Sequence, residues 1–189
     1  MQASDALSLA VELGALLEAA RLPYAIGGAL ALGVHGVSRS TQDVDVNVFV
    51  NAEGLERLIE LLRSNGVQID PAKARNEALS DGVFFCWAGQ TRIDVFTPSI
   101  ELSWEAERTR VSIPIDGKPT WFLAPELLCC FKLLFFRPKD QMDLERLVGS
   151  SATLDTARVR ALMVETMGEG DERVKFWDET VRRFRPSLD

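Results

Sequence analysis

Apolar and polar positions alternate along residues 42–50, QDVDVNVFV, with a valine at every second position of its centre. Successive side chains of a β-strand point to opposite faces. The pattern therefore predicts a strand whose valines pack into a core while its acidic and amide side chains share the other face. Two carboxylates, Asp43 and Asp45, then lie side by side.

Periodic apolar positions predict further elements before and after this strand. Leucines recur at helical spacing over the first twenty residues, where Ser4 can cap a helix. YAIGG at 24–28 is typical of a short strand ending in two glycines, and ALALGVHG at 29–36 of a short helix. Asn51 is expected to cap the helix AEGLERLIELLRSNG at 52–66.

Two later stretches predict β-hairpins. GVFFCWAGQTRIDVFTP at 82–98 is expected to turn at 88–90, and RVSIPIDGKPTWFLA at 110–124 to turn at Asp116-Gly117. The remaining chain has a helical pattern. Strands and helices interleaved first, with helices alone afterwards, predict an α+β fold: a small mixed β-sheet with packed helices, followed by a helical C-terminal part.

A boundary is expected where the strands give way to helices. It divides the chain into a core of residues 1–122 and a helical region of residues 123–189, which we expect to pack on the core as one compact unit. The length of 189 residues is sufficient to bury a sizeable hydrophobic core.

Composition and charge narrow the class of protein. Hydrophobic residues at 47% and charged residues at 26% indicate a folded globular chain. The acidic N-terminal segment is not typical of a signal peptide, and no run reaches membrane-spanning length, so we expect a cytoplasmic protein. The formal net charge of -7 argues against broad nucleic-acid binding, although a local basic groove is compatible with it.

The three cysteines have the spacing of neither a disulfide framework nor a zinc site. We expect buried free thiols.

A third acid is expected near the aspartate pair. In TRIDVF at 91–96, Asp94 lies between two apolar residues and projects from a strand opposite the core. Three neighbouring carboxylates repel one another unless a cation compensates, which favours a site for Mg²⁺. The alternative is that these acids line the wet face of a half-solvated sheet. A calcium loop is excluded because valines separate the acids and the required glycine and terminal glutamate are missing.

The glycine pair Gly27-Gly28 lies where a strand ends and a helix begins. Backbone N–H groups without side chains can approach a phosphate closely there. A tight turn without a ligand is the alternative interpretation. Arg39 and Ser40 precede the acids, where a cation and a hydroxyl can meet a triphosphate, and a solvated turn is again the alternative.

Gly27-Gly28, HGVSRSTQDVDV at 35–46 and RIDVF at 92–96 together resemble the nucleotidyltransferase superfamily, the polymerase-beta-like fold. More closely they resemble the AbiEii-type toxins and related minimal nucleotidyltransferases. The superfamily pattern is a small residue pair, then two acids one residue apart, then a third acid on a later strand. Gly28 stands where many members have serine, so this chain lacks that hydroxyl.

The C-terminal half extends the resemblance. PELLCCFKLLFFRPKDQMDLERL at 125–147 looks like the AbiEii-type pattern of a helical lysine followed by an arginine and an acidic stretch. The match implies that Lys132 contacts nucleotide phosphates and that Asp140, or Asp143, supports the lysine or the acceptor. The alternatives are a lysine that extends to solvent, an Asp140 that caps a helix, and a surface pair of Asp143 with Arg146.

The resemblance implies a metal-dependent enzyme that moves an NMP group from an NTP to a hydroxyl acceptor and releases pyrophosphate. Mg²⁺ or Mn²⁺ would be held by Asp43, Asp45 and Asp94, and Asp94 would also assist deprotonation of the acceptor. The candidate catalytic residues are Asp43, Asp45, Asp94, Lys132 and Asp140. The candidate nucleotide-binding residues are Gly27, Gly28, Arg39, Ser40 and Lys132.

The acceptor is open between tRNA, a protein and a small molecule, and the toxin resemblance implies tRNA and a cognate antitoxin partner. A non-catalytic nucleotide sensor or partner-binding domain with the same fold is the alternative function. A structural protein whose acids merely face water is a third.

Overall fold

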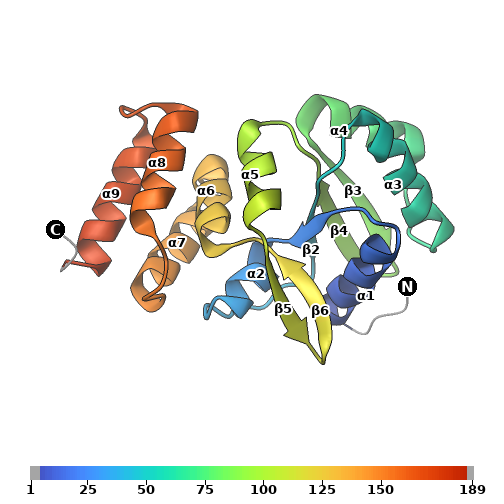
Figure 1. The fold of residues 1–189 in the computed structure, drawn as a ribbon, viewed down its shortest axis with the longest axis horizontal. Helices are drawn as coiled ribbons and strands as arrows, with labels where there is room; N and C mark the ends of the chain where they lie inside the picture. The colour runs from blue at the N-terminus through green and yellow to red at the C-terminus, as the bar shows by residue number, and fades with distance from the viewer. Residues whose placement is uncertain (1–4, 187–189) are drawn as a thin grey trace. The chain divides into compact units, whose positions relative to one another are not determined.

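A computed structural model describes residues 5–186, which fold into two units (Figure 1). The first unit runs to Leu30 and resumes from Ser40 to Leu123. The second unit joins Ala31–Arg39 to the chain from Ala124 onward.

A mixed sheet forms the centre of the first unit. Within the described chain it has six strands in the order β3-β4-β2-β1-β6-β5. The pairs β2/β4 and β1/β6 are parallel, whereas β1/β2, β3/β4 and β5/β6 are antiparallel. The strands are β1 (Tyr24–Ile26), β2 (Val44–Val48), β3 (Val83–Ala88), β4 (Thr91–Phe96), β5 (Val111–Ile115) and β6 (Lys118–Phe122).

The alternating pattern of β2 divides its side chains as the sequence predicts. The three valines are buried, while Asp45 and Asn47 lie on the other face with partial exposure. The two hairpins are also confirmed: Ala88 pairs with Thr91 across the first turn, and Ile115 with Lys118 across the second. The period-two patterns were therefore sufficient to find these strands.

Helices α1 (Ala6–Ala19) and α3 (Ala52–Ser64) belong to the first unit. The carboxylate of Asp5 caps α1 by accepting from the Ser8 N–H at 2.9 Å, whereas Ser4 lies outside the described residues. Asn51 caps α3, as predicted, by accepting from the Gly54 N–H at 3.0 Å.

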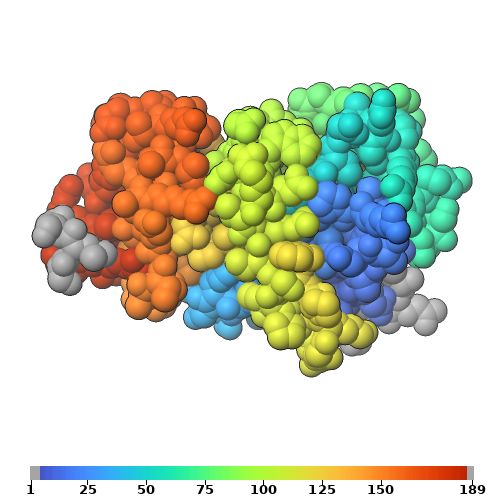
Figure 2. Space-filling view, viewed as in Figure 1, coloured from blue at the N-terminus to red at the C-terminus, as the bar shows by residue number. Residues whose placement is uncertain are grey.

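Two helices of this unit, α4 (Pro71–Asp81) and α5 (Glu101–Thr109), were not predicted from the sequence. The start and stop signals of α4 are nevertheless present: Asp70 accepts from the Lys73 N–H, and Gly82 ends the helix in the left-handed conformation. In the space-filling view α5 and the β5–β6 hairpin form the front of the unit (Figure 2).

Helix α2 (Gly28–Val34) follows β1. From Pro125 onward the regular elements of the described chain are all helices. Trp177 is buried among these helices, and its indole N–H donates to the Thr156 carbonyl at 3.1 Å. The helical C-terminal part is thereby confirmed. Its helices are α6 (Pro125–Phe135), α7 (Pro138–Ser150), α8 (Thr156–Met167) and α9 (Glu172–Phe184).

Two expectations from composition can be compared with the described residues. Cys86, Cys129 and Cys130 are free and buried, as predicted. Between residues 5 and 186 no helix combines the length and the apolar character needed to cross a membrane.

Candidate functional site

Asp45 and Asp94 lie opposite one another on neighbouring strands. Strands β2 and β4 pair in parallel, and the register sets Asp45 against Asp94. Residues paired across a sheet project from the same face. The sequence placed each acid on a non-core face but could not establish that the two strands are neighbours. The structure brings the two carboxylates together.

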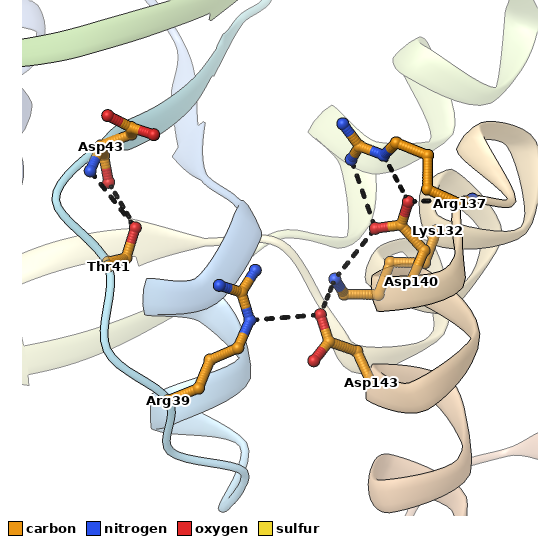
Figure 3. A network of polar contacts seen from close by, with 7 residues as sticks. All are labelled: Arg39, Thr41, Asp43, Lys132, Arg137, Asp140 and Asp143. Carbon is orange, nitrogen blue, oxygen red and sulfur yellow. Dashed lines mark hydrogen bonds and ion pairs between the residues drawn. The ribbon is translucent and has the colours of Figure 1, made fainter.

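Asp43 comes one residue before β2 and is exposed. The Thr41 hydroxyl donates to the Asp43 carbonyl at 3.1 Å and accepts from the Asp43 N–H at 3.3 Å (Figure 3). These two hydrogen bonds define the turn from which β2 begins. They fix the backbone of Asp43 and leave its carboxylate directed away from Thr41.

Gly28 allows the backbone turn after β1 to approach the carboxylate of Asp45. Its φ is +56°, and a Cβ atom at this position would lie 2.5 Å from Asp45 Cγ. The preceding Gly27 donates its N–H to the Asp45 carbonyl at 2.8 Å. Both glycines are therefore explained by close approach to β2, with Gly28 forming a cradle that any side chain would fill.

Arg92 holds the third carboxylate, and sequence reasoning missed it. Its Nε donates to Asp94 Oδ1 at 2.6 Å and its Nη2 to Oδ2 at 3.0 Å. The guanidinium also lies over the Phe85 ring, 4.2 Å from the centroid. The sequence contained the information needed to predict this contact. Residues two apart on a strand share a face, so Arg92 projects beside Asp94.

The acids have the donor chemistry for the divalent cation that the resemblance implies. Carboxylate oxygens are its preferred ligands, and the Gly28 cradle leaves the Asp45 carboxylate room beside the backbone. The described residues contain no group of three or more histidine, cysteine or acidic residues already arranged to hold a metal. Asp45 and Asp94 fit a cation by donor chemistry and register, with Arg92 as the present counter-ion of Asp94.

A second cluster of charges lies within the other unit (Figure 3). Lys132 Nζ is 2.7 Å from Asp143 Oδ2 and 3.6 Å from Asp140 Oδ1. The lysine side chain is 6% exposed and each carboxylate 2%. A lysine that extends to solvent is therefore excluded, and Asp143, rather than Asp140, is its nearer partner.

Asp140 has its strongest contacts with Arg137 at the start of α7. Its Oδ2 accepts from the Arg137 N–H at 3.2 Å, which satisfies a free donor at the helix N-terminus, and from Arg137 Nε at 2.6 Å in an ion pair. The capping interpretation of Asp140 thus describes its geometry. A surface pair of Asp143 with Arg146 does not, because Asp143 is buried and pairs with Lys132 and Arg39.

Arg39 donates from Nε to Asp143 Oδ2 at 3.3 Å, and its side chain is 30% exposed. Arg39 therefore belongs to the second unit, whereas the adjacent Ser40 is exposed and belongs to the first. The predicted site residues form two clusters, one around Asp45 in the first unit and one around Lys132 in the second.

The second cluster contains three cationic and two anionic side chains. It thus has one surplus positive charge, and its arginines are more exposed than its lysine: the Arg137 side chain is 52% exposed. A surplus charge on partly exposed guanidinium groups is suited to binding an anion. The members are Arg39, Lys132, Arg137, Asp140 and Asp143.

Comparison with known proteins gives similarity at the level of structure. No protein-family model matches the sequence, and no curated protein matches it. An antigenic nucleotidyltransferase-like protein from Paracoccidioides brasiliensis superposes with a TM-score of 0.56 at 15% identity, covering 100% of this chain and 92% of that one. ANT(2'')-Ia in complex with adenylyl-2''-tobramycin superposes with a TM-score of 0.50 at 17% identity, covering 94% and 97%.

The fold is nucleotidyltransferase-like. This result confirms the predicted fold class, a mixed sheet with packed helices and a helical C-terminal part. The nucleotidyltransferase-like fold is also consistent with the superfamily resemblance of the aspartate motif, while the AbiEii-type branch within it stays a prediction.

Proposed function

We propose that this protein is a metal-dependent nucleotidyltransferase that moves an NMP group from an NTP to a hydroxyl acceptor. The observation that carries the proposal is the pairing of Asp45 with Asp94 across β2 and β4, with the Gly28 backbone packed against the Asp45 carboxylate. The nucleotidyltransferase-like fold supports it.

The acids would hold Mg²⁺ or Mn²⁺. In this assignment Asp43 and Asp45 are metal ligands and Asp94 completes the set, which agrees with the pairing of Asp45 with Asp94 across β2 and β4. A bound divalent cation supplies charge neutralisation for the phosphates and acidifies a nearby hydroxyl.

The backbone turn at Gly27-Gly28 would lie near the NTP phosphates, with the Asp45 carboxylate packed against Gly28. The acceptor oxygen forms a bond to the α-phosphorus while the bond from that phosphorus to the bridging oxygen breaks, and pyrophosphate leaves. The hydroxyl proton passes to the Asp94 carboxylate. Orientation and charge stabilisation would supply most of the rate enhancement, so no nucleophilic side chain is required.

We assign Lys132 a role in nucleotide binding through its neighbours. A buried ammonium bonded to Asp143 and close to Asp140 orients two carboxylates, and Asp143 in turn orients the partly exposed Arg39. Arg39 would be the group of this cluster that meets a phosphate, with the adjacent Ser40 hydroxyl as a further donor.

For the acceptor we propose a hydroxylated small molecule. With a net charge of -7, the chain has no surplus of basic residues with which to bind the phosphates of a tRNA over a broad surface. One similar structure, ANT(2'')-Ia, is described in complex with adenylyl-2''-tobramycin, a nucleotide joined to a hydroxylated drug. A tRNA acceptor with an antitoxin partner, as in the AbiEii-type resemblance, is the second candidate that the same experiment tests.

The test incubates the pure protein with each α-³²P-labelled NTP and Mg²⁺. Acceptors are total tRNA, cell protein and a set of hydroxylated small molecules, each in a separate reaction. We expect label in the small-molecule fraction and none with Asp45→Asn. Label in tRNA would identify tRNA as the acceptor in place of a small molecule. Label transferred by Asp45→Asn would contradict the catalytic role given to Asp45.

An absence of label in every fraction would contradict the proposed nucleotidyltransferase activity. Thermal stabilisation by an NTP in that case would favour the alternative function, a nucleotide sensor, because a ligand that binds the native state raises the melting temperature.

A further inference from the structure

The carboxylate of Asp94 already has a cationic partner within its own strand. Both Asp94 oxygens accept from the Arg92 guanidinium, at 2.6 and 3.0 Å. A two-point contact of this kind fixes the carboxylate more firmly than a single hydrogen bond. Asp94 is therefore oriented without a metal ion.

The neighbouring edge strand holds Arg92 in place. The register pairs Phe85 of β3 with Asp94 and Trp87 with Arg92, so these side chains share the face of the acids. The guanidinium stacks on the Phe85 ring at 4.2 Å. Arg92 remains 37% exposed, so the pair lies where water or a ligand can reach it. A pair at such a place can exchange partners at modest cost.

Charge balance shows what this arrangement does. A divalent cation near Asp45 would approach the positive charge of the Arg92 guanidinium, which also engages the two Asp94 oxygens that would coordinate the cation. Like charges at short range repel.

We propose that Arg92 is a positioning residue that holds Asp94 in the metal-free protein and competes with the divalent cation for that carboxylate. This inference rests on the proposed function, since it concerns the same acids. Cation binding exchanges one partner of Asp94 for another, so the protein keeps its third acid oriented and charge-compensated between turnovers.

The test measures Mn²⁺ affinity by calorimetry and by electron paramagnetic resonance, with no nucleotide and no turnover. Arg92→Gln is measured in the wild-type background and in Asp94→Asn. We expect Arg92→Gln to tighten Mn²⁺ binding at least threefold when Asp94 is present and to have a much smaller effect in Asp94→Asn. Unchanged or weaker affinity after Arg92→Gln would overturn the proposal.

An equal gain in both backgrounds would also overturn it, because the effect would then be general electrostatics and not competition for Asp94. Arg110→Gln is the matched control: it removes one charge from an arginine of the same unit that stacks on Trp121. This control is expected to leave Mn²⁺ affinity unchanged. Circular dichroism of each variant checks that the fold is retained.

Asp45→Asn separates this inference from the proposed function. If the wild type binds Mn²⁺, Asp45→Asn abolishes binding and Arg92→Gln has no effect, the inference fails and the proposed function stands. If neither the wild type nor Arg92→Gln binds Mn²⁺, both fail.

Discussion

At the scale of single residues, the contact between Gly28 and Asp45 is the tightest constraint on the site. Gly28→Ala would place a methyl group on the Asp45 carboxylate at a backbone φ of +56°. We expect a loss of about 3 kcal/mol of stability from strain and overlap. Displacement of the carboxylate should cost on the order of 10²-fold in transfer.

Gly89→Ala is the matched control for this change. Its φ is +60°, but nothing lies within 4 Å of the added Cβ. It should cost only about 1 kcal/mol, from the left-handed conformation, and leave transfer intact. Chemical denaturation and the transfer assay measure both; equal losses for the two variants would contradict the role given to Gly28.

The cysteines give a second prediction at this scale. Burial, and then the charge of Asp94, raise the pKa of Cys86 to about 12, and burial raises the pKa of Cys130 to about 12 as well. Burial also holds the pKa of Cys129 well above its ordinary value of 9.0. Thiolates are the reactive form, so the native protein should not react with a disulfide reagent at pH 8.

The same shifts give the expected pH dependence of stability. Unfolded thiols ionise near pH 9.0, whereas the native thiols of Cys86 and Cys130 stay protonated to about pH 12. The unfolded state therefore binds fewer protons in this window, and the free energy of unfolding should fall as pH rises from 9 to 12. Rapid labelling of the native thiols at pH 8 would contradict the expectation that burial keeps them protonated and unreactive.

At the scale of elements, the buried pair of Lys132 and Asp143 joins α6 to α7. Asp143→Ala would leave a buried ammonium without its nearest partner and should cost about 3–5 kcal/mol. Lys132→Met combined with Asp143→Leu should cost less than the sum of the single changes, since the pair is then replaced by apolar contacts.

Chemical denaturation of the single and double variants measures this coupling. The control is Arg63→Ala, which removes an exposed pair with Glu60 in which both side chains are 59% exposed. No measurable loss is expected there. Additive losses at Lys132 and Asp143 would show that the pair contributes no coupling.

The elements also show how far sequence reasoning reaches. Alternation predicted β2 and both hairpins because one face of each strand is buried, and capping side chains marked α3. Helix α4 was missed although Asp70 and Gly82 flank it, because its own residues are mostly polar and give little periodic signal. The pairing of β2 with β4 joins segments about fifty residues apart, which no local pattern encodes.

The candidate site divides in the same way. The acids and glycines were found because charges in an apolar strand and a glycine pair are local signals. Arg92 was missed because its importance depends on Asp94 being its partner, and the preference of Lys132 for Asp143 over Asp140 depends on how α6 packs on α7. Partner choice is a tertiary property.

At the scale of the whole molecule, the nucleotidyltransferase-like fold is retained at 15 to 17% identity to the solved structures that resemble it. Conservation of a fold at this distance requires the core pattern and not particular surface residues. Activity must therefore be established at the acids themselves.

The most direct measurement is the rate at which pyrophosphate is released from an NTP in the presence of Mg²⁺ and the acceptor fraction that takes up label. It is made with the wild type, Asp45→Asn and Asp116→Asn. Asp116 lies exposed in the turn between β5 and β6 and undergoes the same charge change. The proposed function predicts that Asp45→Asn loses at least about 10³-fold in rate and that Asp116→Asn keeps the wild-type rate. Equal rates for all three proteins would contradict it.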